Sequence, residues 1–130
     1  MRYNSITIYR LTLYRVTKEL RRHMSVETAL TETTYYILLS LYSPRHGYGI
    51  IQETERLSGG RIRLAAGTLY GALNSMCDKG WILLLPVEDG SRKKEYKITQ
   101  RGLEVLQGEL ARLRELVENG DKVMGGKDNG

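Results

Sequence analysis

Two stretches in the first half of the chain place apolar side chains at helical spacing. The first covers residues 29–42 and ends before Pro44, which removes a backbone donor and disfavours further helix. The second covers residues 47–60 and ends at Gly59 and Gly60, where a left-handed backbone is favourable. Two short, closely connected helices are therefore predicted.

A third helix follows a short link. Residues 61–64, RIRL, alternate charged and apolar side chains, which predicts a short strand. In the following stretch, GTLYGALNSMCDKGW, Leu69, Leu73 and Met76 fall at i, i+4 and i+7, the spacing of one buried helix face. The outward-facing residues of this helix are then Thr68, Tyr70, Gly71, Asn74 and Ser75.

The period then changes from helical to alternating. Residues 81–88 are typical of a strand, residues 89–94 of a turn with charges at its tip, and residues 95–99 of a second strand. Thr99 is a suitable cap for a last helix from about residue 100 to residue 119. This order predicts a winged helix-turn-helix, mainly α with a small β-hairpin (α+β), plus a long C-terminal dimerisation helix.

The net charge of +5 is concentrated at the N-terminus. Residues 1–23 hold six Lys and Arg against one acid, whereas fourteen basic and fourteen acidic residues follow from Met24 onward. Two hypotheses fit this segment: a basic arm that lies along DNA phosphates, or a non-native or disordered extension that precedes a natural start at Met24. We expect a winged helix-turn-helix DNA-binding domain over 24–98, a dimerisation helix over 99–120 and a flexible tail over 121–130.

The composition argues against several classes of protein. No apolar run is long enough to span a membrane, and no signal region is recognisable, so a cytoplasmic protein is expected. The single cysteine, Cys77, fits a small, partly buried helix residue and, with two histidines, makes a poor metal set. The sequence contains no acid–base pair, nucleophile constellation or phosphate loop, so we expect no enzyme, no catalytic or metal site and no cofactor.

The third helix carries the residues that best fit DNA. In a helix-turn-helix the second helix of the motif enters the major groove, which is about 12 Å wide and leaves little room for bulky side chains. Gly71 suits such an approach, Thr68 and Tyr70 offer hydroxyls, and the Asn74 amide matches adenine. Taken alone, the same residues also fit an ordinary polar helix face.

The predicted hairpin turn adds basic side chains at the second contact point of a winged helix. Arg92, Lys93 and Lys94 stand consecutively there and are placed to meet phosphates or the minor groove. Arg61 and Arg63, just before the third helix, are candidates for further phosphate contacts. Charged turns are common on surfaces, so the combination with the third helix is what favours DNA binding.

The last helix indicates a partner. Its apolar positions step by three and four residues, as in a coiled-coil seam, and Val105 and Leu116 form a second apolar strip. A second copy of the chain would cover one strip and give a two-fold dimer; the alternative is packing entirely against the first helix of the same chain. The predicted interface residues are Leu103, Leu106, Leu110, Leu113 and Val117.

These blocks together resemble the PadR family of bacterial transcriptional regulators. The matching segments are LTETTYYILLSLYSPRHGYGI, GTLYGALNSMCDKGWI and RKKEYKITQRG, in this order and spacing. The resemblance implies a homodimeric repressor of the smaller subfamily, with the third helix in the major groove of double-stranded DNA and the wing near the minor groove. It places Thr68, Tyr70 and Asn74 in the recognition helix, and Lys93 and Lys94 in the wing.

The resemblance also bears on structure and regulation. It places His46, Gly47 and Tyr48 in the HGY block of the family, which we interpret as mainly structural: Gly47 and Gly49 let backbones approach, and Tyr48 packs and is also a candidate for a phosphate contact. Some relatives bind hydrophobic or aromatic small-molecule effectors around their dimer helices. Here the only tryptophan, Trp81, lies in the predicted hairpin strand rather than in the last helix, so an aromatic sandwich on the last helix is not supported.

The resulting functional prediction is a sequence-specific DNA-binding transcriptional repressor that acts as a homodimer on a palindromic operator. Release from DNA by a small-molecule effector is compatible with the family resemblance. The alternative is a winged-helix protein-interaction module that binds no operator. Binding to DNA at two salt concentrations distinguishes them, because phosphate contacts release counterions.

Overall fold

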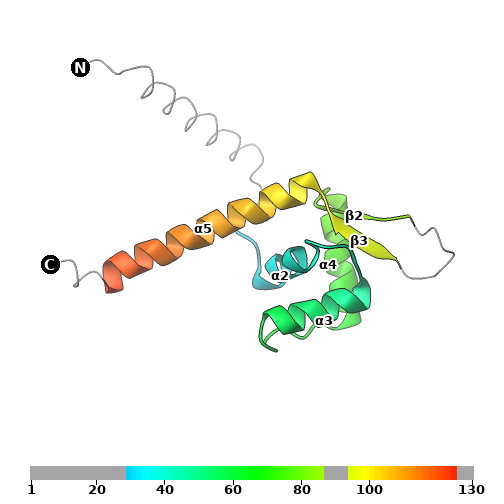
Figure 1. The fold of residues 1–130 in the computed structure, drawn as a ribbon, viewed down its shortest axis with the longest axis horizontal. Coiled ribbons are helices and arrows are strands. Elements are labelled where there is room, and N and C mark those ends of the chain that lie inside the picture. Colours follow the sequence, from blue (N-terminus) through cyan, green and yellow to red (C-terminus); the bar gives the residue numbers. More distant parts are fainter. Residues whose placement is uncertain (1–28, 87–93, 126–130) are drawn as a thin grey trace, which may run out of the picture.

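The computed structural model describes residues 29–86 and 94–125. The elements are α2 (Glu32–Ser40), β1 (Arg45–His46), α3 (Gly47–Leu57), α4 (Ala66–Asp78), β2 (Ile82–Leu84), β3 (Glu95–Ile98) and α5 (Gln100–Met124). Figure 1 shows α2, α3 and α4 grouped below the first part of α5. The rest of α5 extends past this group to the left, whereas the β2–β3 hairpin points to the right. This mainly helical fold with a small sheet and a long last helix confirms the predicted fold class.

Helix α2 begins at a capping side chain. Thr31 Oγ1 accepts a hydrogen bond from the Thr34 amide at 3.1 Å and so satisfies one of the free N–H groups of the first turn. Ile37 and Leu38 of this helix are fully buried in the core. The first predicted helix is thus confirmed, although it is shorter than predicted at both ends.

Helix α3 ends just before the predicted pair of glycines. Gly59 and Gly60 have φ angles of 62° and 85°, a region that residues with side chains rarely adopt. The strand predicted over residues 61–64 is wrong, because this link between α3 and α4 pairs with none of the described strands. Alternating side chains alone do not make a strand, since a strand also needs a neighbour with free backbone donors and acceptors.

The sheet is antiparallel and has the strand order β1-β3-β2. In the predicted hairpin, Ile82 lies opposite Ile98 and Leu84 lies opposite Tyr96. Strand β2 is shorter than the predicted run over residues 81–88, and β1, which pairs along the other edge of β3, was not predicted. Two residues are too few for a period of two to be recognised.

Helix α5 begins as predicted but ends later. Thr99 Oγ1 accepts a hydrogen bond from the backbone amide three residues later at 3.0 Å, which confirms the predicted cap. The helix runs to Met124, so the assignment of residues 121–124 to a flexible tail is wrong. An ion pair between Glu118 and Lys122 at 3.6 Å, one helical turn apart, supports this last part of the helix.

The core lies between the helices and the sheet. The buried positions of α4 are those that the spacing predicted, and alternate residues of β3 are buried, as in a strand with one face on the core. The buried apolar side chains are Ile37, Leu38, Leu41, Ile50, Leu69, Leu73, Met76, Trp81, Ile82, Tyr96, Ile98 and Leu106. This core holds α4 by one face and leaves the opposite face of that helix exposed.

Candidate nucleic-acid interface

The exposed face of α4 consists of small and polar side chains. Leu69, Leu73 and Met76 are buried on the inner face. The exposed residues on the other side include Thr68, Tyr70, Gly71, Asn74 and Ser75, as predicted. Their orientation is therefore confirmed, whereas their role in binding DNA stays a prediction.

Tyr70 lies against the start of α3. Its side chain is 47% exposed. A Cβ built on buried Gly47 would lie 2.5 Å from the Tyr70 hydroxyl oxygen and 3.1 Å from Cζ. Gly47 therefore permits a close approach, but by the Tyr70 side chain and not by a backbone as predicted. The prediction that Tyr48 packs is wrong, since this side chain is 64% exposed.

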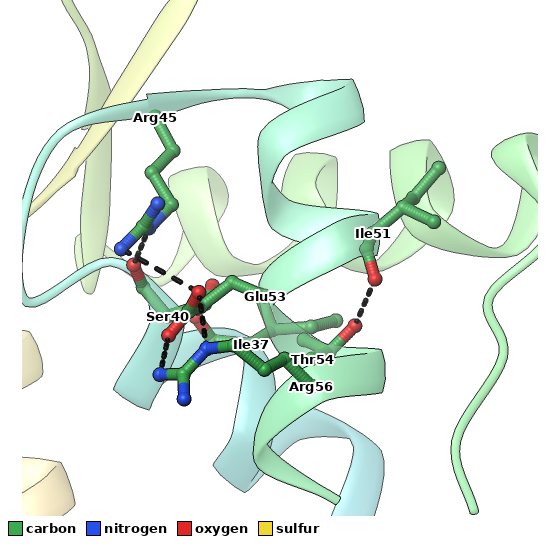
Figure 2. Close-up of polar contacts among 7 residues, drawn as sticks. All are labelled: Ile37, Ser40, Arg45, Ile51, Glu53, Thr54 and Arg56. Atoms are coloured by element: carbon green, nitrogen blue, oxygen red, sulfur yellow. Dashed lines mark hydrogen bonds and ion pairs between the residues drawn. The ribbon is translucent and has the colours of Figure 1, made fainter. Parts of the chain in front are cut away.

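A polar cluster ties α3 to the end of α2 (Figure 2). Arg45 Nε donates a 2.7 Å hydrogen bond to the Ser40 carbonyl oxygen, and its Nη2 lies 3.8 Å from Glu53 Oε2. Glu53 also accepts hydrogen bonds from Arg56 at 3.1 and 2.5 Å. These bonds lower the pKa of Glu53 against the opposing effect of burial. The cluster fixes α2 against α3, and α3 in turn packs against α4.

The two arginines before α4 are engaged with acids of the same chain. Arg61 forms an ion pair with Glu32, and Arg63 Nε lies 3.2 Å from Glu55 Oε1. Both arginine side chains are largely exposed, so these pairs are accessible to competing anions. Contact of Arg63 with phosphate would therefore replace the contact with Glu55.

The wing is described only in part. Arg92 and Lys93 lie outside the described residues, and Lys94 is exposed immediately before β3. Tyr96 and Ile98 turn inward from β3 and anchor this strand in the core. Lys94 is thereby held at the turn end of β3, and its contact with DNA stays a prediction.

The apolar seam of α5 divides into two parts. Leu106 belongs to the chain's own core, and Leu103 is half-buried against it. Farther along, Leu113 is half-buried, whereas Leu110 and Val117 are 36% and 63% exposed. Packing against the same chain accounts for the first part only. A dimer interface stays a prediction for the seam as a whole.

Three residues that the sequence analysis missed have structural roles. Arg45 holds the α2–α3 junction, Gly102 sits against the Trp81 carbonyl, and Glu109 is buried with hydrogen-bond partners. The sequence carried one clue to the last of these, because Glu109 follows buried Leu106 at helical spacing. A carboxylate in register with buried positions indicates a buried polar contact.

Three other features of the described residues concern metal binding, membrane insertion and cysteine reactivity. Among residues 29–86 and 94–125, no His, Cys, Asp and Glu side chains gather in threes as a metal site requires. None of the helices described is long and apolar enough to cross a membrane. Cys77 is half-buried, as predicted, and burial raises the pKa of its thiol.

Comparisons with known proteins agree on one family. The model of the transcriptional regulator PadR-like family matches residues 36–108. A PadR family transcriptional regulator from Eggerthella lenta is 24% identical in sequence, with 90% of this chain and 96% of that chain covered and a TM-score of 0.58. A PadR family regulator from Clostridium difficile is 21% identical, with coverage of 72% and 99% and a TM-score of 0.61.

One similar structure was determined with nucleic acid. Bacillus subtilis PadR in complex with operator DNA is 26% identical, with a TM-score of 0.53. The match covers 61% of this chain and 46% of that protein. A comparison with curated proteins gives no significant match.

Proposed function

Because the chain belongs to the PadR-like family of transcriptional regulators, we propose that it is a homodimer that binds a palindromic operator and represses transcription. Members of this family regulate transcription and are not enzymes. In this proposal α4 enters the major groove, and the wing lies on the flanking phosphates. The operator complex of Bacillus subtilis PadR supports DNA as the ligand.

The observation that carries the proposal is Gly71, a residue without a side chain on the exposed face of α4. A glycine inside a helix costs about 1 kcal/mol relative to alanine. A Cβ built on Gly71 would meet nothing within 4 Å, so packing within the described chain does not require this glycine. The close approach of another molecule does explain it. The major groove is such a surface, because its width of about 12 Å leaves little space around a helix.

The neighbouring side chains fit the chemistry of the groove. Asn74 is exposed one helical turn from Tyr70, and its amide has the donor and acceptor that pair with adenine. Thr68 and Tyr70 offer hydroxyls that bind phosphate or a base edge. Exposed Lys94 and Arg63 flank this face in the sequence and are suited to phosphate.

The second half of α5 provides the surface for a second copy. Apolar side chains are exposed along it, including Leu110, Leu116 and Val117. A self-complementary contact between two such helices would bury them and present two α4 helices to a two-fold symmetric site. Release by a hydrophobic or aromatic effector stays a prediction from the family resemblance. Trp81 does not favour an exposed aromatic site, because it is buried.

The experiment measures binding of the full chain to the DNA upstream of its own gene at 50 and 200 mM salt, against a scrambled duplex. We expect a specific complex that weakens about 10³-fold or more over this range if six or more phosphates are contacted. Equal, weak binding to both duplexes would refute the proposal and favour a protein-interaction module.

Two variants separate base contacts from phosphate contacts. Asn74→Ala should reduce affinity for the operator by about 1–3 kcal/mol and leave affinity for scrambled DNA unchanged. Lys94→Ala should weaken binding to both duplexes and lower the salt slope by about 0.9 for each phosphate that the variant no longer neutralises. Lys122→Ala removes the same charge from exposed α5 and should leave the slope unchanged.

A further inference from the structure

The last buried residue of α5 is a carboxylate. Gly102, Leu106 and Glu109 are the buried positions of this helix, and Glu109 is only 5% exposed. Beyond it, every residue from Leu110 to Gly125 is exposed or partly exposed. Glu109 therefore lies where α5 leaves the body of the protein, as the long free end of the helix in Figure 1 illustrates.

Glu109 joins α5 to the start of α2. Its Oε2 accepts a 2.9 Å hydrogen bond from the backbone amide of Leu30, just before the α2 cap. Arg112 Nε and Nη2 donate to the two carboxylate oxygens at 2.5 and 2.9 Å. These partners lower the pKa of Glu109 although burial opposes them. The carboxylate thus has one partner within α5 and one, Leu30, that lies 79 residues away from Glu109 in the sequence.

A buried carboxylate is an unusual choice for this position. Desolvation of a charged group costs free energy, and an apolar side chain of similar size would often be equally or more stabilising. Unlike apolar packing, hydrogen bonds are directional, so they restrict both the tilt and the rotation of α5. In several proteins buried polar groups are retained because they select one geometry.

We propose that Glu109 is a positioning residue that fixes the direction in which α5 leaves the DNA-binding domain, and thereby the spacing of operator half-sites that the dimer accepts. This inference rests on the proposed function. The free part of α5, from Leu110 to Met124, is about 22 Å long at 1.5 Å per residue. A tilt of about 10° at Glu109 moves its tip by about 4 Å, close to the length of one base-pair step of about 3.4 Å.

The first test measures binding of the full chain to operators with the natural half-site spacing and with spacings one and two base pairs longer or shorter. We expect the wild type to prefer the natural spacing about tenfold or more, and Glu109→Ala to prefer it less than about threefold. The dimer, measured by sedimentation, and affinity for an isolated half-site should not change. Glu118→Ala, also on α5 but exposed, is the matched control and should keep the preference.

The second test reports geometry without DNA. Spin labels at position 75, introduced by Ser75→Cys in a Cys77→Ser background, give the distance between the two α4 helices of the dimer. We expect Glu109→Ala to broaden this distance distribution. Glu109→Gln keeps an acceptor for the Leu30 amide but loses the charge. The width of its distance distribution should lie between those of the wild type and Glu109→Ala. If Glu109→Ala does not fold, this conservative variant decides both tests.

The outcomes separate this inference from the proposed function. A wild-type protein that is monomeric or prefers no half-site spacing refutes the proposed function and this inference with it. A wild type that prefers one spacing, with Glu109 variants that share its preference and its distance distribution, overturns the role of Glu109 alone.

Discussion

Gly102, at the start of α5, is the position where one added methyl group should have the largest effect on stability. A Cβ built there would overlap the carbonyl oxygen of Trp81 and would lie 2.7 Å from Cγ1 of Ile98. The obstruction is backbone, which cannot rotate away as the end of a side chain can. The Trp81 carbonyl is also held in place, because it accepts a 2.9 Å hydrogen bond from the Thr99 amide. It also lies 3.0 Å from Thr99 Oγ1, whose single proton is shared with the nearer Gly80 carbonyl oxygen at 2.6 Å.

The magnitude for Gly102→Ala follows from these contacts. Loss of the hydrogen bond from the Thr99 amide to Trp81 costs about 1 kcal/mol, and overpacking adds about 1–3 kcal/mol. The higher helix propensity of alanine offsets about 1 kcal/mol. The free energy of unfolding should therefore fall by about 1–3 kcal/mol, a substantial fraction of the 5–15 kcal/mol typical of a folded protein.

The assay is urea unfolding at one protein concentration, followed by Trp81 fluorescence and helical circular dichroism. Gly108→Ala is the matched control, because this glycine lies in the same helix and a Cβ there would meet nothing within 4 Å. The control should be stabilised by about 0.5–1 kcal/mol. If Gly102→Ala is as stable as Gly108→Ala, the assignment of Gly102 to a backbone contact is refuted.

Three further predictions concern the site, two hydrogen-bonded carboxylates and the dimer. Gly47→Ala displaces the Tyr70 side chain and should lower operator affinity severalfold in a gel-shift assay, with a change in urea stability below about 1 kcal/mol; unchanged affinity would contradict a role for this contact. Because Glu53 and Glu109 have pKa values below the ordinary 4.5, their stabilisation is complete above this value and is lost as pH falls through the lowered values. The free energy of unfolding should therefore decrease between pH 7 and pH 3. The double variant Glu53→Gln/Glu109→Gln should show a smaller decrease. Leu110→Glu should leave a folded monomer in sedimentation, and a persistent dimer would place the interface elsewhere.

Local patterns in the sequence were sufficient for the elements that present the candidate site. The i, i+4, i+7 spacing of Leu69, Leu73 and Met76 identified the inner face of α4, and hence the exposed one. Thr99 marked the start of α5 by its capping chemistry. These features depend on residues within one or two turns of each other, so helix geometry alone relates them.

Contacts between distant residues were decided only by the tertiary structure. Residues 61–64 alternate like a strand yet pair with none of the strands in the described part of the chain, whereas Arg45 and His46 show no pattern and complete the sheet beside β3. The contact of the Tyr70 side chain with Gly47 and the hydrogen bond from the Leu30 amide to Glu109 likewise join separate parts of the chain. The sequence determined which faces of its helices are apolar. Folding determined which strand edges and buried polar groups meet, because those partners lie far apart in the chain and no local period relates them.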